Sequence, residues 1–314
     1  MDKISIVMAT YNGGRFLKEQ LNSLCKQTRI PDEVIVVDDG STDNTLAILE
    51  EFSKVLNLSI HINTNHLGVN GNFEKGLNLC SGDYIMFCDQ DDYWLPNKIE
   101  LMYKKMLEIE DKKTPCIVSS RDTYADINLK ESPLLNPYPS YIFYPQNNCD
   151  YRETVIKHLS QGCAMMLNRK CLEYILPIPK NEVCYDYYIG FTIAMIGKKY
   201  DMKESLMLYR VHGNNVTATT NRNFTNLPKI RYRNVGVVPQ HFINTYNKAI
   251  SEKGNFFIKK RYNYVSRIIS LSNDKNSLLK HIILLCSIKH IPIQLRVRSL
   301  KNKILNFIFN IHQP

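Results

Sequence analysis

An apolar run, Tyr84–Cys88, leads directly into the acidic stretch Asp89-Gln90-Asp91-Asp92-Tyr93-Trp94. The length of the run and the turn residues before it predict a buried strand. Three carboxylates within four residues repel one another at the end of such a strand, so this pattern is unusual without a cation. Carboxylate oxygens are the ligands that hard divalent cations prefer, and an open site can complete its coordination with phosphates. The stretch therefore predicts a metal site at a strand end.

The spacing of these carboxylates gives them different expected roles. Alternate residues of an extended segment share a side, so Asp89 and Asp91 are the expected metal ligands. Asp92 is then expected to hold the turn or to touch a substrate. The alternative is a solvated acidic turn, which is the commoner origin of a lone D-x-D pair. Trp94, the single tryptophan of the chain, follows directly and disfavours that alternative.

The first hundred residues alternate strand-like and helix-like patterns, which predicts an α/β fold with a parallel sheet and crossover helices. Ligands of such sheets bind beyond the carboxyl ends of the strands. Thr10-Tyr11-Asn12, Asp38-Asp39 and the acidic stretch all follow strand ends, so we expect them to converge on one ligand. The predicted strands are Ile4–Met8, Glu33–Val37, Leu58–Ile62, Tyr84–Cys88, Cys116–Ser119, Gln161–Leu167 and Ser205–Arg210, and the predicted helices follow Gly14, Ser41 and Pro96 and cover Asn72–Cys80 and Tyr185–Ile196, with a long loop over Asp122–Asp150.

A second acidic pair, Asp38-Asp39, ends the second predicted strand. A carboxylate at a strand tip can accept the imide N–H of uracil or thymine, which is a base-selective contact. Thr10, Tyr11 and Asn12 are expected to line the same pocket, with Tyr11 packing beside the base ring. The alternative is a helix-capping turn at Ser41-Thr42-Asp43, in which Ser41 or Thr42 is the expected cap.

Composition bounds the domain organisation and the partners. The chain has 314 residues, of which 44% are hydrophobic, enough for one large α/β domain with an appended subdomain. Its net charge of +10 is uneven, because the residues from Arg222 onward hold 17 Lys and Arg against two acidic residues. We therefore divide the chain into an α/β domain, residues 1–220, and a basic, mostly helical extension, residues 221–314.

The basic extension has three interpretations. Lys and Arg alternate there with Ile, Leu and Phe, which favours peripheral contact with an anionic membrane. The second interpretation is a helical subdomain packed on the first domain. The third interpretation is binding to a nucleic acid, but no recognised module accompanies the charge, so no nucleic-acid partner is expected. The nine cysteines include no CxxC pair, and neither a secretory signal nor a membrane span is evident, so we expect a cytoplasmic protein.

Four motifs occur here in the order and spacing found in one family. The chain resembles the family-2 nucleotide-sugar glycosyltransferases over residues 3–215, and among them it looks most like bacterial rhamnosyltransferases. The resemblance implies a GT-A fold, a mostly parallel Rossmann-like sheet flanked by helices, and sugar transfer with inversion from a nucleoside diphosphate donor. The residues that carry it are Val7–Gly13, Val37–Asp43, Asn65–Gly68 and Gly82–Trp94, with Gln161-Gly162-Cys163 and Tyr209–Asn215 downstream.

The resemblance also implies roles for individual residues. It gives Asp39 to the base of the donor, and Asp91, with Asp89 nearby, to Mn²⁺ or Mg²⁺ and the diphosphate. It makes Asp186 the general base, although Tyr185 stands where the family usually has Glu or His, and a helix N-cap is the alternative role of Asp186.

Two residues of the downstream motif have open interpretations. His212 is a candidate metal ligand or phosphate contact, or else a surface histidine. Arg210 is a candidate diphosphate ligand, or else part of a salt bridge to the body of the protein.

The sequence thus predicts an inverting transferase that moves L-rhamnose from dTDP-L-rhamnose to a glycan or lipid-linked acceptor in bacterial surface polysaccharide synthesis. The alternatives are a UDP-hexose donor and a non-catalytic, membrane-associated nucleotide-sugar binding protein. A dinucleotide-dependent oxidoreductase is disfavoured, since the loop Ala9–Gly14 lacks G-x-G-x-x-G. Gln90 has no role in this interpretation.

Overall fold

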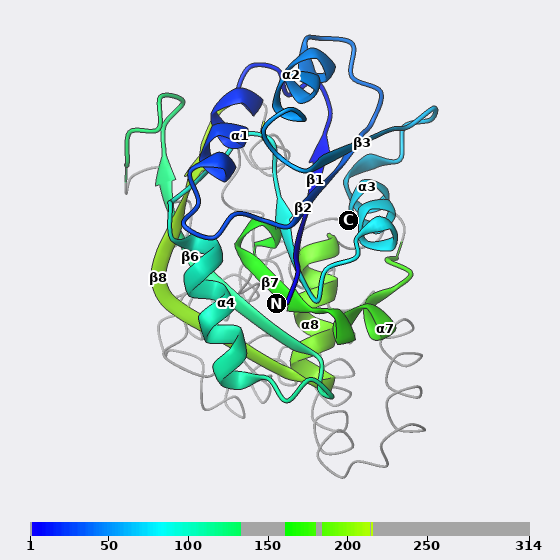
Figure 1. Cartoon of the computed structure of the whole chain (residues 1–314), viewed down its shortest axis with the longest axis vertical. Coiled ribbons are helices and arrows are strands. Elements are labelled where there is room, and N and C mark those ends of the chain that lie inside the picture. Colours follow the sequence, from blue (N-terminus) through cyan, green and yellow to red (C-terminus); the bar gives the residue numbers. More distant parts are fainter. Residues whose placement is uncertain (1, 133–160, 180–183, 214, 216–314) are drawn as a thin grey trace, which may run out of the picture. The chain divides into compact units, whose positions relative to one another are not determined.

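The computed structural model describes residues 2–132, 161–179, 184–213 and 215. Within these ranges eight strands form one sheet in the order β3-β2-β1-β4-β7-β6-β8-β5, flanked by helices (Figure 1). The fold is therefore α/β, as predicted. The strands are β1 Ile4–Thr10, β2 Glu33–Asp38, β3 Leu58–Ile62, β4 Tyr84–Cys88, β5 Tyr93–Trp94, β6 Cys116–Ala125, β7 Met165–Asn168 and β8 Lys198–Arg210, and the helices are α1 Leu17–Cys25, α2 Thr45–Phe52, α3 Gly68–Leu79, α4 Lys98–Ile109, α7 Leu172–Ile175 and α8 Tyr185–Ile196, with 3-10 turns η2 Gly162–Ala164 and η3 Arg169–Cys171.

Strands β1 to β4 form the parallel half of the sheet. Both faces of β1, β2 and β4 are buried, which explains their near-continuous apolar sequences, whereas the edge strand β3 is partly exposed and alternates apolar with polar residues. Ile6 of β1 faces the core that holds α1, α2 and α4, whereas Val7 faces α3. A Cβ on Gly76 of α3 would lie 2.2 Å from Val7 Cγ1, so the helix packs there without a side chain. This close packing fixes α3 beside the ends of β1 and β2.

The other half of the sheet is mixed. Strand β7 pairs antiparallel with β4 and β6, and β6 runs parallel to β8. The short β5 pairs antiparallel with β8, with Trp94 opposite Met207. As a result the acidic stretch between β4 and β5 bridges two parts of the sheet.

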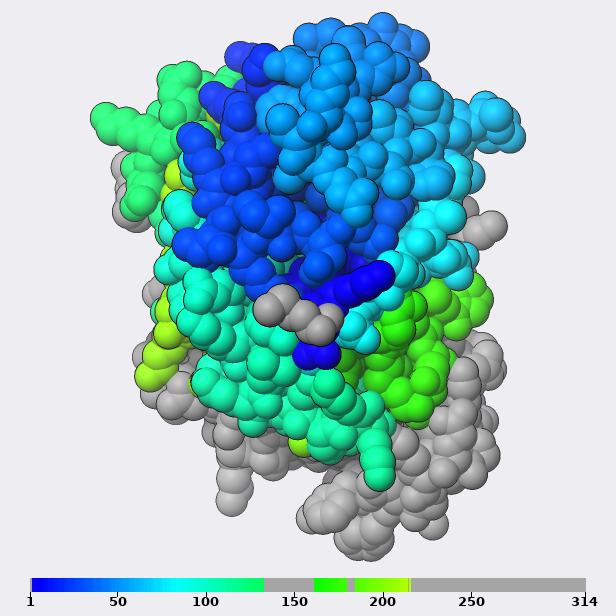
Figure 2. Space-filling model, in the orientation of Figure 1, coloured from blue at the N-terminus to red at the C-terminus, as the bar shows by residue number. Residues whose placement is uncertain are grey.

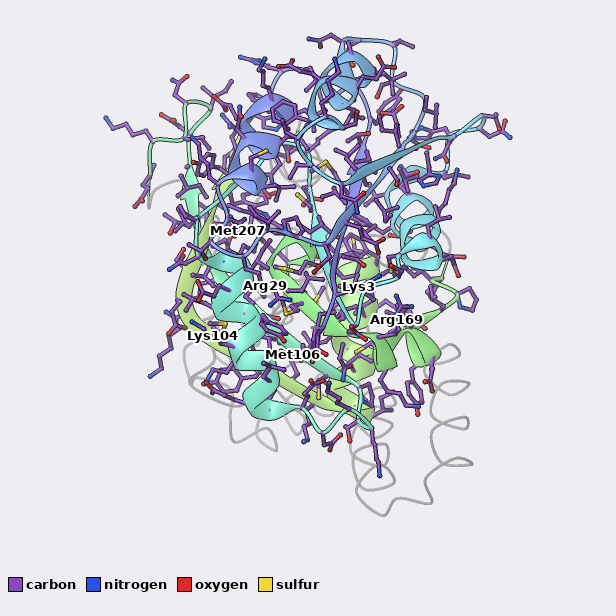
Figure 3. All side chains as sticks on the ribbon, viewed as in Figure 1. Lys3, Arg29, Lys104, Met106, Arg169 and Met207 are labelled. Atoms are coloured by element: carbon purple, nitrogen blue, oxygen red, sulfur yellow. The ribbon has the colours of Figure 1, made fainter. Side chains whose placement is uncertain are left out.

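Hydrogen bonds and a ring contact join segments that are far apart in the sequence. After α1, Thr28 N–H donates to the Pro96 carbonyl at 2.8 Å, and the Arg29 guanidinium lies 4.0 Å from the centre of the Tyr103 ring. Figure 2 shows the blue N-terminal segments beside the blue-green segment around residue 100, and Figure 3 labels Arg29. Arg169, also labelled in Figure 3, donates from Nε to the Gly82 carbonyl at 2.7 Å. These contacts fix the start of β4, and hence the position of the acidic stretch at its end.

Several element boundaries differ from the prediction. Strands β1 and β2 extend through Thr10 and Asp38, and β8 begins at Lys198, seven residues earlier than expected. Strand β6 continues through Ala125 into the predicted loop. The segment Gln161–Leu167 is only partly a strand, because η2 occupies its first half.

Within the predicted capping turn, Asp43 bonds the start of α2, whereas the prediction that Ser41 or Thr42 is the cap is wrong. The helix begins at Thr45, whose N–H donates to Asp43 Oδ1 at 3.0 Å. Ser41 and Thr42 instead bond the loop after β1, as described below.

Two predictions concern residues outside the described ranges. These are the helical character of the extension 221–314 and most of the long loop, residues 133–150. Among the described residues, no helix is long and apolar enough to span a membrane.

Candidate active site

The loops after β1 and β2 are bonded to each other. Asn12 adopts a positive φ of 47°, a conformation that asparagine tolerates better than most residues. Its backbone N–H donates to Ser41 Oγ at 2.8 Å, and its side-chain Oδ1 accepts the Thr42 N–H at 2.8 Å. Gly13 N–H donates to Thr45 Oγ1 at 2.9 Å. Asn12 therefore holds the loop in place, which is a different contact from the predicted base contact.

Asp38 and Thr10, the last residues of β2 and β1, bond to each other, and Asp38 also bonds to the loop after β2. Both side chains are buried, and Thr10 Oγ1 donates to Asp38 Oδ2 at 2.7 Å. Asp38 also accepts the Ser41 N–H at 2.8 Å and the Ser41 hydroxyl at 2.6 Å. Thr10 Oγ1 is thus bonded to the neighbouring strand, and its contact with a base stays a prediction.

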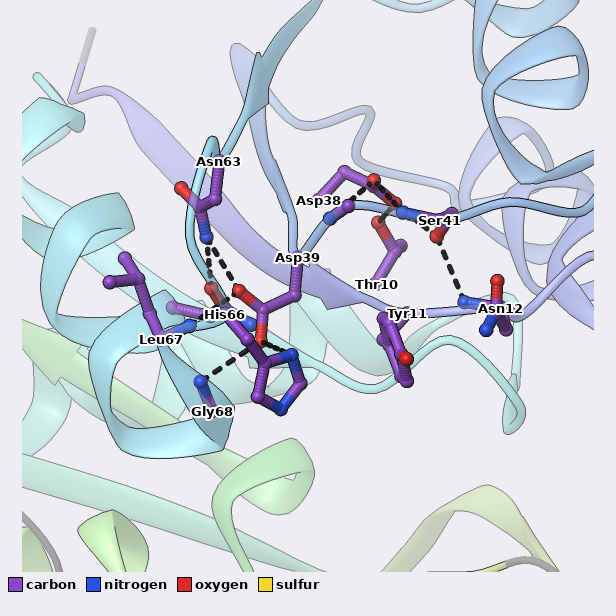
Figure 4. Close-up of polar contacts among 12 residues, drawn as sticks. Thr10, Tyr11, Asn12, Asp38, Asp39, Ser41, Asn63, His66, Leu67 and Gly68 are labelled. Atoms are coloured by element: carbon purple, nitrogen blue, oxygen red, sulfur yellow. Dashed lines mark hydrogen bonds and ion pairs between the residues drawn. The ribbon is translucent and has the colours of Figure 1, made fainter.

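Asp39 lies at the predicted position, where its carboxylate accepts bonds from four donors (Figure 4). Leu67 N–H and Gly68 N–H, at 2.7 and 2.9 Å, belong to the start of α3. Asn63 Nδ2 donates at 2.9 Å, and His66 Nδ1 lies at 2.8 Å. Burial alone would raise the pKa of Asp39, but the bonds from Leu67, Asn63 and Gly68 outweigh it and lower that pKa.

A base that bonds to Asp39 has to compete with one of these donors. A carboxylate offers about four acceptor positions, and all are in use. The His66 side chain is 62% exposed, so it is the donor that a ligand can displace. Tyr11, 49% exposed, lies with its ring 5.0 Å from the His66 ring, on the open side predicted for the base.

The acidic stretch brings together charges that the fold only partly compensates. Asp92 is fully buried, and its Oδ1 accepts the Arg210 N–H at 3.1 Å, while its Oδ2 has no hydrogen-bond partner among the described residues. Candidate ligand atoms of Asp89, Asp92 and Cys163 lie within 4.8 Å of one another. Burial, with Asp91 nearby, raises the pKa of Asp89 to about 7 and that of Asp92 well above its usual value.

These observations fit a divalent cation. A cation would offset the repulsion between the carboxylates and supply the partner that Asp92 Oδ2 lacks. Sequence reasoning set Asp92 aside and treated Cys163 as a core residue. Cys163 is indeed buried, but its thiol faces the carboxylates, and the motif Gln161-Gly162-Cys163 was the available signal.

His212 lies beside the acidic stretch. Its Nε2 is 2.9 Å from Asp91 Oδ2, and its ring lies 4.7 Å from the ring of Phe16. The His212 N–H donates to Asn215 Oδ1 at 2.6 Å, which closes the turn after β8. These contacts place His212 where a metal ligand was predicted, and they exclude a plain surface histidine.

Arg210 is buried, and its guanidinium is directed at protein acceptors. Nε donates to the Asp91 carbonyl at 2.8 Å and Nη1 to the Ile127 carbonyl at 2.5 Å, while Nη2 pairs with Glu19. The Phe16 ring lies 4.6 Å from its Cζ. The contacts therefore match the alternative of a salt bridge to the body, rather than the predicted binding of diphosphate.

Asp186 lies in the first turn of α8. Its Oδ1 accepts the Tyr187 N–H at 2.7 Å, and its charge contributes to the raised pKa of Asp89. Cys184 is the residue at the N-cap position, so Asp186 is not the cap. Tyr185 N–H donates to Asn70 Oδ1 at 3.0 Å, which anchors the start of the helix to α3.

Tyr185, which departs from the family pattern, packs in the core. Its ring stacks 4.2 Å from the ring of Phe73 and lies 5.2 Å from that of Phe87. A Cβ on Gly162 would lie 1.7 Å from Tyr185 Oη, so only glycine fits there. The turn that carries Cys163 and the helix that carries Asp186 are thus in direct contact.

Sequence reasoning missed Lys98, a fully buried lysine beneath the site. Its Nζ donates to the Cys163 carbonyl at 2.6 Å, contacts Met207 Sδ at 3.1 Å, and lies 4.1 Å from the centre of the Trp94 ring. Burial lowers its pKa to about 8, although nearby groups such as Asp92 oppose the shift. A lysine four residues after the tryptophan, at the start of α4, was the signal.

Bonded loops at the ends of β1 and β2, crowded carboxylates after β4 and a carboxylate at the start of α8 fit a nucleotide-sugar transferase of the GT-A type. The chain belongs to Glycosyl transferase family 2, which matches residues 5–175. It is therefore a glycosyltransferase that uses a nucleotide-sugar donor.

Named relatives and solved structures agree with this family. The dTDP-rhamnosyl transferase RfbG of Shigella flexneri is 28% identical over 267 residues, which cover 79% of this chain and 83% of RfbG. An uncharacterized glycosyltransferase of Nostoc sp. is 28% identical over 225 residues, 68% of this chain, and the chain spans 66% of that relative's length. The structure of S. aureus TarS 1-349 in complex with UDP-GlcNAc superposes with a TM-score of 0.58 at 17% identity, covering 96% of this chain and 89% of TarS 1-349.

Proposed function

We propose that the protein transfers L-rhamnose from dTDP-L-rhamnose to a hydroxyl of a glycan or lipid-linked acceptor, with inversion at the anomeric carbon. The supporting observation is that Asp186, in the first turn of α8, lies near enough to the acidic stretch for its charge to contribute to the raised pKa of Asp89. A base on one side of a sugar and a leaving group on the other is what inversion requires.

Asp186 acts as the general base in this proposal. It takes the proton of the acceptor hydroxyl while the acceptor oxygen bonds to the anomeric carbon, and the bond from that carbon to the diphosphate oxygen breaks. The electron pair leaves with the nucleoside diphosphate. General-base assistance of this kind typically contributes about 10²–10⁴-fold to the rate.

Asp89 and Asp91 would hold Mn²⁺ or Mg²⁺ beside the diphosphate, with His212 next to Asp91. When bound, such an ion acts as a Lewis acid that stabilises the charge on the leaving diphosphate. Asp39 and Tyr11 receive the base, after His66 gives up its contact with Asp39.

The donor is the least constrained part of this proposal. RfbG, which aligns over most of its length, is named as a dTDP-rhamnosyl transferase. A UDP-hexose donor is the second candidate, because a 96-residue segment is 41% identical to the β-N-acetylglucosaminyltransferase TarS of Staphylococcus aureus. Uracil and thymine share the imide N–H that Asp39 is positioned to accept, so Asp39 does not distinguish them.

We also propose that residues 221–314 form a separate extension that contacts the anionic inner face of a bacterial membrane. The support is compositional, namely 17 basic and two acidic residues from Arg222 onward, interleaved with apolar side chains. Co-sedimentation of the full chain with phosphatidylglycerol vesicles, but not with phosphatidylcholine vesicles, is the expected result. Equal sedimentation with both kinds of vesicle would contradict it.

Turnover measurements test the transfer reaction. The full chain is incubated with dTDP-L-rhamnose, UDP-glucose or UDP-GlcNAc and with Mn²⁺ or Mg²⁺, and release of the nucleoside diphosphate is followed with and without a glycan acceptor. We expect Asp186→Asn to lose about 10²–10⁴-fold of the transfer rate. Glu51→Gln, an exposed residue of α2 paired with Lys18, is the matched control. Full transfer by Asp186→Asn would remove Asp186 as the base.

A further inference from the structure

Gln90 forms a two-bond contact with the backbone of a distant loop. Its Nε2 donates to the Tyr11 carbonyl at 3.1 Å, and its Oε1 accepts the Tyr11 N–H at 2.9 Å. One side-chain amide therefore satisfies both backbone polar groups of Tyr11, as a neighbouring strand would. Gln90 itself lies between Asp89 and Asp91 in the chain.

The loop after β1 closes tightly around this amide. A Cβ on Gly13 would lie 2.1 Å from Gln90 Oε1 and 2.5 Å from its Cδ, so a larger residue at position 13 would expel the glutamine. On its other side the same loop is bonded to the β2 loop through Asn12, Ser41 and Thr42. Gln90 thus bonds the loop after β1 to the acidic stretch, and the same loop is already bonded to the loop after β2.

We propose that Gln90 is a positioning residue that couples occupancy of the base pocket to the geometry of the cation site. Tyr11, whose backbone it holds, has its ring beside His66 on the base side. Asp89 and Asp91, its neighbours in the chain, lie on the cation side. The inference rests on the proposed function, since it takes the Tyr11 side as the base pocket and the carboxylates as cation ligands.

The chemistry requires glutamine in particular. The contact needs one donor and one acceptor at the end of the same side chain, and an amide provides both. Glutamate cannot donate to the Tyr11 carbonyl when ionised, and methionine of similar length can do neither. Asparagine keeps both groups but is one methylene shorter, so it does not reach both atoms together. The bonded arrangement therefore disappears in Gln90→Met and in Gln90→Asn.

Coupling between two sites is reciprocal and can be measured without turnover. A phosphate-free nucleoside separates coupling through the protein from direct contact, because thymidine or uridine has no diphosphate with which to reach the ion. The dissociation constant of Mn²⁺ is measured on the full chain, by electron paramagnetic resonance of free Mn²⁺, with and without saturating nucleoside. The same pair of measurements is made on Gln90→Met, Gln90→Asn and the control Asn78→Ala, an exposed amide of α3 that bonds to the Glu74 carbonyl.

We expect the nucleoside to tighten Mn²⁺ binding about fivefold or more in the unaltered protein and in Asn78→Ala, near the lower end of typical couplings. In both Gln90 variants, the ratio of the Mn²⁺ dissociation constants measured without and with nucleoside should fall to about one. Mn²⁺ alone should still bind, and the midpoint of thermal unfolding should stay close to that of the control. A ratio that persists in both variants, or a ratio of one in the unaltered protein, overturns the proposal. Nucleotide-sugar turnover is measured on the same samples. Transfer by an unaltered protein that shows no coupling, or by variants that keep it, refutes this inference and leaves the proposed function standing, whereas absence of transfer by the unaltered protein counts against the proposed function.

Discussion

Replacing Asp39 tests whether this carboxylate holds the start of α3 as well as receiving the base. In Asp39→Ala the Leu67 and Gly68 N–H groups lose their acceptor, a loss comparable to removing a helix cap, which costs about 0.5–2 kcal/mol. One N–H of the buried Asn63 amide is also left without its partner, at about 1–3 kcal/mol, while its bond to Asn72 remains. The exposed His66 adds little. The free energy of unfolding should therefore fall by about 3 kcal/mol.

Equilibrium unfolding in urea measures this change from the shift of the transition midpoint at constant slope. Asn78→Ala on the same helix serves as control and should stay within about 0.5 kcal/mol of the unaltered protein, as exposed substitutions usually do. Asp39→Asn retains one acceptor oxygen and should fall between the two. An Asp39→Ala midpoint equal to that of the control would refute the cap, and Asp39 would then be explained by base binding alone.

Three further predictions concern residues around the site. Lys98→Met keeps a side chain of similar length but removes the hydrogen bond to the Cys163 carbonyl and a buried charge beside carboxylates. We expect the free energy of unfolding in urea to fall by about 3 kcal/mol and to be partly restored by Mn²⁺. An unchanged midpoint would contradict this expectation. Gly162→Ala forces a Cβ against the buried Tyr185 ring, so the thermal midpoint should fall and transfer measured below that midpoint should fall at least tenfold. Turnover equal to that of the unaltered protein would show that this contact does not position α8. Burial would raise the pKa of Asp111, but bonds from Thr114 outweigh it and lower the pKa to about 2. The stability that this exposed carboxylate contributes is therefore present at neutral pH and is lost as the pH falls from about 4 toward 2. The stability difference between the unaltered protein and Asp111→Asn, about 1 kcal/mol or less at pH 7 because the group is solvated, should therefore vanish near pH 2, and a difference independent of pH would contradict the assignment.

The parallel half of the sheet was predictable because buried strands are apolar runs between turn residues. The ends of β1 and β2 were missed because Thr10 and Asp38 are polar, and each is buried through its bond to the other. The first residues of β8 were missed for the same reason, since Lys199 and Asp201 are buried as an ion pair at 2.6 Å. Polar residues that satisfy one another across strands carry no signal in a pattern based on hydrophobicity.

The positions of the carboxylates in the candidate site were predictable from the sequence, because acidic residues at the ends of buried strands are unusual without a function. The carboxylates at strand ends lie where the sheet topology requires them, and Asp186 lies at the start of a helix as expected. The directions of charged side chains were not predictable. Arg210 is the last residue of β8, yet its guanidinium is directed inward, where Glu19, far away in the chain, supplies a carboxylate.

The acidic stretch is held from three directions, and this arrangement has a consequence for metal binding. Gln90 attaches it to the β1 loop, Arg210 bonds the Asp91 carbonyl and Asp92 from β8, and Lys98 fixes the turn that carries Cys163. Carboxylates free to move would separate until their repulsion was screened by water. Carboxylates held together cannot do so, and the raised pKa of Asp89 records that cost. In the proposed function, a cation that enters the site would therefore meet ligands that are already assembled, and the fold rather than the ion would supply the free energy of bringing them together.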